Sequence, residues 1–122
     1  MRLYSRTTQA DALHQAGESE AALALFREAE AMQRERQPDY PRLYSLPGFR
    51  YCDLLLARAG VDLAGIGEVV ERATYALEIS TQQLGLLDIA LDQLTLGRAH
   101  LQRACVETIG TVGRIARQRH PT

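Results

Sequence analysis

Apolar residues recur at steps of three and four along most of the chain, the spacing of one face of an α-helix. The stretch from Ala10 to Arg36 is rich in Ala, Leu, Glu and Arg, which lose little side-chain freedom in a helix. Gly17 interrupts it, because glycine readily adopts the left-handed conformation that ends helices. We therefore expect two antiparallel helices joined at Gly17. The second carries its largest apolar side chain, Phe26, in this stripe: Ala22, Leu25, Phe26, Ala29 and Met32.

Proline and glycine divide the middle of the chain. Pro38, Pro41 and Pro47 predict a connector, since proline lacks the amide hydrogen that a helix interior needs. We expect Ser45 to cap a third helix with Pro47 in its first turn. Gly60 then ends this helix, and Asp62 begins a fourth.

The C-terminal third shows two different patterns. The segment from Leu86 to Leu101 is apolar on nearly every side, which predicts a helix packed centrally between others. The tail that follows contains Gly110 and Gly113, which weaken a helix, yet some of its apolar residues share one helical face. We expect a separate, cap-like helix there. No segment alternates with the period of a β-strand, so the sequence predicts an all-α fold of about five to six helices.

The helices recur with a long period. Gly17 and Gly60 close corresponding helices 43 residues apart, and Asp53 and Gly97 occupy matching places 44 residues apart. A period in this range indicates stacked helical hairpins, each too small to bury its own apolar face. We divide the single domain, 1–122, into a first pair (1–37), a second pair (45–83) and a third, incomplete pair with an atypical tail (86–122).

Two segments carry a resemblance to the tetratricopeptide-repeat family. Gly17 followed by Ala22, Phe26 and Ala29 resembles the second helix of that repeat. The segment Leu96-Gly97-Arg98-Ala99-His100-Leu101 is similar to its first helix, in which leucine and glycine let two helices approach closely. The period is longer than the usual repeat of about 34 residues, and Asp53 stands where the family prefers a small residue.

The resemblance implies a right-handed stack of antiparallel helical hairpins in which the first helix of each pair lines a concave, peptide-binding surface. The residues it places there are Thr7, Asp11, His14, Arg50, Leu54, Arg58, Leu94, Arg98 and Gln102. Arginine forks beside apolar side chains suit an extended peptide with a carboxylate or acidic side chain. We therefore expect a protein or peptide interaction module. The alternative is a regulatory arm or fragment of a larger signalling ATPase or transcription regulator.

The composition disfavours some classes of partner but does not identify one. The formal net charge is −1, from 14 basic and 15 acidic residues, so bulk charge favours neither nucleic acid nor a membrane as partner. All basic residues are arginine, which we interpret as a bacterial type of genomic composition. No apolar run approaches the ~20 residues that span a bilayer. Two cysteines without metal or redox spacing fit a reducing cytoplasm.

Candidate catalytic groups are sparse. Cys52 lies among apolar residues, where a small hydrophobic side chain packs well. Asp88 and Asp92 stand one helical turn apart, and we expect them on a solvated or arginine-paired face. We expect no catalytic residue, metal or cofactor, and therefore no enzyme. The five arginines of the C-terminal 25 residues favour a solvated end over an acidic partner or nucleic acid.

The incomplete third pair leaves two alternatives open. Repeat arrays generally need a polar terminal cap, and the tail is a poor one. The chain therefore either self-associates through its C-terminal helices, most simply as a two-fold dimer, or belongs to a longer array.

Overall fold

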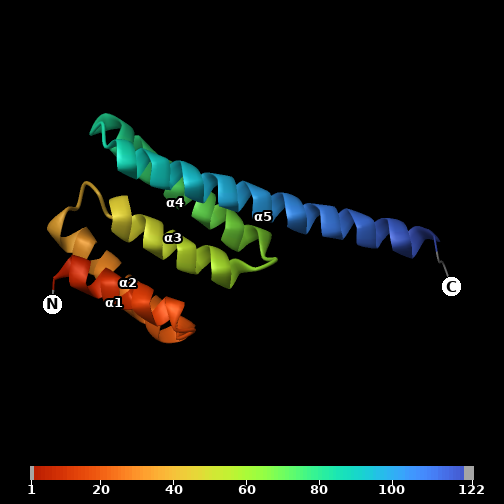
Figure 1. The fold of residues 1–122 in the computed structure, drawn as a ribbon, viewed down its shortest axis with the longest axis horizontal. Coiled ribbons are helices and arrows are strands. Elements are labelled where there is room, and N and C mark those ends of the chain that lie inside the picture. The colour runs from red at the N-terminus through yellow and green to blue at the C-terminus, as the bar shows by residue number, and fades with distance from the viewer. Residues whose placement is uncertain (1, 120–122) are drawn as a thin grey trace.

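A computed structural model describes residues 2–119 as five helices without a β-strand (Figure 1). This confirms the all-helical expectation. The helices are α1 (Leu3–Gln15), α2 (Ser19–Arg36), α3 (Ser45–Ala59), α4 (Leu63–Gln82) and α5 (Leu86–Arg119).

Glycine and aspartate set the helix boundaries that the sequence predicts. Gly17 and Gly60 have φ angles of 83° and 54°, the left-handed region that non-glycine residues rarely adopt. Asp62 caps α4, because its carboxylate accepts a hydrogen bond of 3.1 Å from the backbone N–H of Ala64. These boundaries are confirmed.

The expected Ser45 cap is wrong. Tyr44 precedes α3, and no side chain caps that end. The Ser45 hydroxyl instead donates a hydrogen bond of 2.9 Å to the Asp88 carboxylate, at the beginning of α5. The Ser45 hydroxyl, which the local pattern assigns to capping α3, is therefore bonded instead to an acceptor 43 residues away.

The connector between α2 and α3 packs tightly onto the first turn of α3. A Cβ atom at Gly48 would lie 2.8 Å from the backbone oxygen of Leu43, so this position requires glycine. Leu43 itself is buried in the core. The segment is thus a fixed part of the fold.

The helices pack in chain order, and α3 lies at the centre. It contacts each of the other four helices, whereas α5 contacts only α3 and α4 (Figure 1). The expectation of a central helix from Leu86 to Leu101 is therefore wrong. Its buried residues are Asp92, Thr95 and Ala99, while four of its leucines are exposed: Leu86, Leu87, Leu94 and Leu101.

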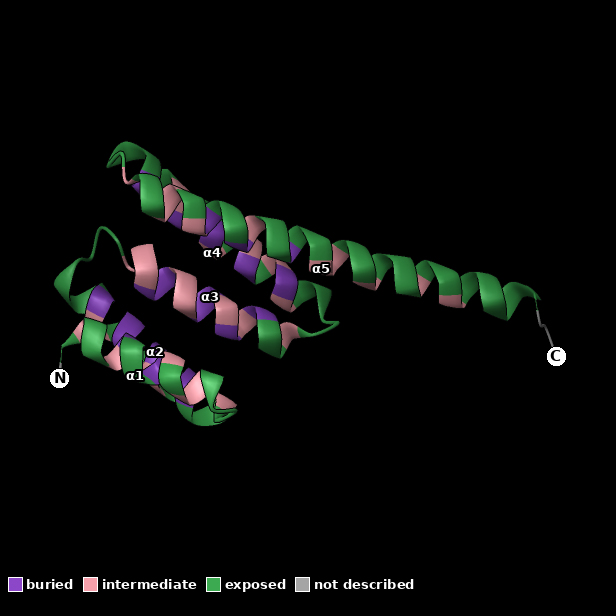
Figure 2. Cartoon of the chain, in the orientation of Figure 1, coloured by how far each residue is buried: buried purple, intermediate pink, exposed green. Residues whose placement is uncertain are grey.

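The separate tail helix is also wrong, because α5 continues without interruption to Arg119. Gly110 and Gly113 lie inside this helix and do not break it. No residue of α5 after Ala99 is buried, and the C-terminal half projects beyond the other helices (Figure 2). The third hairpin thus has no second helix among residues 2–119.

Two apolar clusters hold the helices together. In the first, Phe26 is fully buried and its ring stacks on that of Tyr51, with centroids 4.9 Å apart. The second joins Cys52 and Ile66 to Ala99 of α5. The core positions predicted for Phe26 and Cys52 are confirmed.

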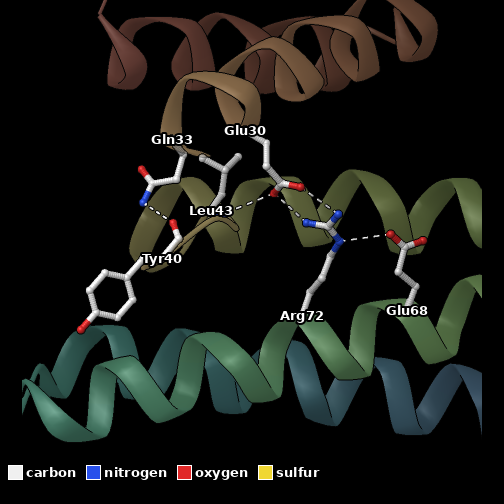
Figure 3. A network of polar contacts seen from close by, with 6 residues as sticks. All are labelled: Glu30, Gln33, Tyr40, Leu43, Glu68 and Arg72. Atoms are coloured by element: carbon white, nitrogen blue, oxygen red, sulfur yellow. Dashed lines mark hydrogen bonds and ion pairs between the residues drawn. The ribbon is translucent and has the colours of Figure 1, made fainter. Parts of the chain in front are cut away.

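A buried ion pair fastens α2 to α4 (Figure 3). The guanidinium of Arg72 donates two hydrogen bonds, of 2.7 and 3.0 Å, to the carboxylate of Glu30. Glu30 also accepts from the backbone N–H of Leu43, and Arg72 lies 4.8 Å from the centroid of the Tyr51 ring. These contacts tie the connector and three helices to one charged pair.

None of the described helices is long and apolar enough to cross a lipid bilayer.

Candidate peptide-binding groove

Two adjoining hollows mark the surface formed by α1, α3 and α5. The first, of about 490 Å³, lies over α1 and α3, and the second, of about 460 Å³, lies over α3 and α5. They share Asp53 and Arg98. We refer to them together as the α1–α3–α5 groove, lined by Asp11, Gln15, Leu46, Phe49, Arg50, Asp53, Leu56, Ala57, Arg98, Leu101, Gln102 and Cys105.

Helical spacing explains why α3 supplies most of the lining. Leu46, Phe49, Arg50, Asp53 and Ala57 follow one another at steps of three, one, three and four residues, so they share one face of α3. The opposite face carries Tyr51 and Leu54 into the core. One helix therefore provides both the packing at the centre of the fold and the floor of the groove.

Charged side chains from three helices meet at the middle of the groove. The carboxylate of Asp53 lies 3.1 Å from Nε2 of His14 on α1 and 3.4 Å from a guanidinium nitrogen of Arg98 on α5. Asp53 is the acidic residue that departs from the repeat pattern. It links the first, third and fifth helices.

A second charged cluster lies at the α1 side. Arg50 is 3.8 Å from the Asp11 carboxylate and donates a hydrogen bond of 3.1 Å to the Thr8 hydroxyl. Its ion pair is long compared with the ideal of 2.7–2.9 Å for charge-assisted hydrogen bonds. The guanidinium thus retains N–H groups that an incoming carboxylate can engage.

Apolar side chains lie between these charges. Leu46 and Phe49 are partly exposed in the first hollow, and Leu101 and Cys105 are exposed in the second. A groove with apolar surface and a few converging polar groups is the usual form of a ligand site.

The structure sorts the nine predicted site residues into three groups. Asp11, Arg50, Arg98 and Gln102 line the groove, and His14 reaches it through Asp53. Arg58 pairs with Glu20 beyond the groove, and Leu94 is exposed but lines neither hollow.

The prediction that Thr7 and Leu54 present a binding surface is wrong. Both are fully buried, and the Thr7 hydroxyl donates to the backbone oxygen of Tyr4. Each helix carries a core face beside its groove face, and these two residues fall on the core side.

Sequence reasoning missed several lining residues, of which Asp53 and Phe49 matter most. Asp53 gave a signal, as a charged residue where the repeat pattern expects a small one. Phe49 gave no such signal, because the apolar residues around it in the sequence make it look like a core residue. Gln102 acts partly as a tie, since its amide donates to the backbone oxygens of Leu56 and Gly60 at the end of α3.

A larger hollow, of about 710 Å³, lies at the other end of the fold, between the first turn of α1, the end of α2 and the connector. Its polar groups bond mainly to one another. Gln33 donates to Gln37 and to the backbone oxygen of Tyr40, and the Tyr44 hydroxyl donates to Gln37. The lining of this hollow includes two arginines, Arg2 and Arg36, but no acidic side chain, so it lacks the opposite charges that meet in the α1–α3–α5 groove.

Two titratable groups outside the groove, Cys52 and Asp92, are buried and have raised pKa values. Burial raises the pKa of the Cys52 thiol to about 12, which keeps it protonated at neutral pH. Asp92 is buried beside Ser80, and desolvation raises the pKa of its carboxyl group to about 6. The expected solvated or arginine-paired face for Asp88 and Asp92 is wrong, because both accept hydrogen bonds from serine hydroxyls. Within residues 2–119, no three His, Cys, Asp or Glu side chains are grouped to hold a metal ion.

Comparison of the chain with protein-family models, curated proteins and solved structures found no match.

Proposed function

We propose that the chain is a protein-interaction module that binds an extended peptide along the α1–α3–α5 groove. The single observation that carries this proposal is the meeting of charged side chains from three helices over partly exposed apolar surface, centred on Asp53 and Arg98. Such an arrangement combines apolar pockets with charges that fix orientation.

The packing order supports a hairpin-repeat architecture of the tetratricopeptide type. Helix α3 contacts both α1 and α5, α2 and α4 complete the first two hairpins, and α2 also contacts α3. We propose that this is a right-handed stack and that the groove is its concave face. The turn glycines at matching places, Gly17 and Gly60, are consistent with two successive repeats.

We propose a ligand with a carboxylate, either an acidic side chain or a chain terminus, next to an apolar residue. Arg98 is half exposed and makes its ion pair at 3.4 Å, and Arg50 makes its own at 3.8 Å. Both geometries leave N–H donors for a ligand carboxylate. The ligand's apolar residue would lie against Leu46 and Phe49.

A displayed peptide library tests the specificity. Peptides selected on the purified protein should be enriched in an acidic residue, or a free C-terminus, adjacent to an apolar residue. A selection that yields no consensus, or a consensus of basic peptides, contradicts the proposed ligand.

Fluorescence anisotropy with a selected peptide then locates the site. Arg50→Ala and Arg98→Ala should each weaken binding about tenfold, as expected for loss of a charge-assisted hydrogen bond. Arg34→Ala, on the exposed side of α2, is the matched control and should leave affinity unchanged. Equal affinity in all three variants would show that the peptide binds elsewhere.

A further inference from the structure

Helix α5 has an exposed apolar face along its whole length, on the side opposite the bundle. The bundle lies along one side of α5 only, so this outer face has no neighbour (Figure 1). Five of its large apolar side chains are between 47% and 73% exposed: Leu87, Leu94, Leu101, Val112 and Ile115. The same face runs through both the packed and the projecting halves.

The face has a seven-residue period. Leu87, Leu94, Leu101, Thr108 and Ile115 form one series, and Leu91, Arg98, Cys105 and Val112 form the second, four positions later. Alternating steps of four and three residues are the pattern by which one helix pairs with another along a continuous seam. Nothing in the described chain occupies this seam.

Small residues flank the seam at the same period. Ala90, Gly97, Ala104 and Thr111 are seven residues apart and all exposed. A Cβ atom added at Gly97 would meet nothing within 4 Å, so no contact inside the chain requires this glycine. The close approach of two helices that the repeat resemblance assigns to Gly97 is therefore wrong within the chain. A helix from outside would give these small residues a role, because interaxial distance depends on side-chain size at the contact.

We propose that this face pairs with α5 of a second copy of the chain to form an antiparallel, two-fold symmetric dimer. An antiparallel pair covers the projecting half of each helix with the packed half of the other. The bundles lie on the outer sides of the pair and do not meet. The seam shares Arg98, Leu101 and Cys105 with the peptide groove. Leu94 and Val112 line neither hollow, so their substitution tests the dimer without changing the groove.

The sequence fits one register of this pair well. When the two-fold axis passes near residue 103, Leu94 lies opposite Val112 of the second copy, Leu91 opposite Ile115, and Leu101 opposite Cys105. The only charged residue in the middle of the seam, Arg98, lies opposite Thr108. Leu94, Leu91 and Leu101 therefore meet apolar or weakly polar side chains across the axis. Near each end of the pair, Leu87 lies opposite Arg119.

The available area matches what a stable dimer needs. A fully exposed large side chain presents roughly 100 Å² of apolar surface, so the five residues, which are 47% to 73% exposed, present about 300 Å². The small residues between them bring the apolar area to about 400 Å². A standard interface removes about 800 Å² from each partner, a little over half of it apolar. The α5 face alone supplies an apolar contribution of this size.

Analytical ultracentrifugation of the full chain tests the proposal. The wild-type chain should change from monomer to dimer as concentration rises. Val112→Glu and Leu94→Arg should each raise the dissociation constant at least tenfold, because each places a charge against an apolar residue of the second copy. Val112 lies in the projecting half, so its substitution leaves the core intact. His100→Glu, an exposed position outside the seam on the same helix, is the matched control and should dimerise like wild type.

The double variant Leu94→Arg with Val112→Glu tests the register. Arginine then faces glutamate at both ends of the pair, so dimerisation should recover to within about threefold of wild type. Three results contradict the proposal: a wild-type chain that is monomeric at every concentration, single variants that dimerise like His100→Glu, or a double variant that remains monomeric.

Discussion

The two halves of α5 share one outer face but have opposite surroundings on the inner one. Up to Ala99 the helix packs on α3 and α4, and Asp92, Thr95 and Ala99 are buried. Beyond Ala99 no described residue of the helix is buried, although Ile109 and Val112 are as apolar as the leucines before them. Local apolar character therefore does not distinguish the packed half from the projecting one.

The packed half of α5 contacts the other helices through hydrogen bonds and one small side chain more than through large apolar side chains. Asp92 accepts a hydrogen bond from Ser80, Asp88 accepts one from Ser45, and Ala99 is small enough to lie in the second core cluster. Gln102 and Val106 continue these contacts past Ala99, whereas the described residues after Val106 make no hydrogen bond or core contact with another helix. The difference shows that helix pairing in this fold depends on a few specific side chains, and that the leucines of α5 are left for an outer surface.

Truncation of the buried Phe26 should lower the free energy of unfolding far more than truncation of a side chain in the projecting half of α5. This ring is fully buried and stacks on Tyr51, so Phe26→Ala should lower the free energy of unfolding by about 3–5 kcal/mol. Urea denaturation followed by circular dichroism measures the loss.

Val112→Ala is the contrasting variant in the projecting half. At concentrations where the chain is monomeric, it should change the free energy of unfolding by less than about 0.5 kcal/mol. Similar losses in the two variants would mean that α5 packs differently from the arrangement described.

The buried ion pair gives the next largest effect. Arg72→Met leaves the Glu30 carboxylate buried without its partner, which should cost about 3 kcal/mol at neutral pH. Glu68→Ala removes the exposed partner of the same arginine and should cost less than about 1 kcal/mol. If the two variants lose equal stability, Glu30 does not carry the interaction.

The buried carboxyl group of Asp92, in the packed half of α5, should make the free energy of unfolding depend on pH. Burial raises the pKa of its carboxyl group from 3.8 to about 6, so the folded state holds this proton more tightly than the unfolded state. The stabilisation that the neutral form provides is full below pH 4 and is lost as pH rises through 6.

Asp92→Asn should remove that loss. The variant should match wild type at pH 4 and exceed its free energy of unfolding by about 3 kcal/mol at pH 8. Its amide can also donate to Ser80, whose single hydroxyl proton lies between Asp92 and the backbone oxygen of Ala76. Parallel stability curves for variant and wild type from pH 4 to 8 would contradict the raised pKa.

Local pattern predicted the helices and their turns well, because glycine and capping residues act within a few positions of themselves. Gly17, Gly60 and Asp62 are such cases. The errors at Ser45 and Asp88 have one cause: their hydrogen-bond partners are 43 residues apart, and no local rule pairs them.

The candidate groove could be predicted in part. Helical spacing and the repeat resemblance predicted Asp11, Arg50 and Arg98 as groove residues. Thr7 and Leu54 lie on α1 and α3, as Asp11 and Arg50 do, but on the face turned toward the core. Which face of each helix is turned inward depends on how α1 and α3 pack together. The Glu30–Arg72 pair joins residues 42 positions apart and likewise gives no local signal.

Hydrogen–deuterium exchange of α5 at low and high protein concentration tests the central claim most directly, because it reports on both halves of the helix at once. We predict that amides of residues 92–102 are protected at both concentrations. Amides of residues 104–119 should be protected only at high concentration, when a second copy covers them. Exchange in residues 104–119 that is the same at both concentrations, and the same in Val112→Glu, would contradict the account.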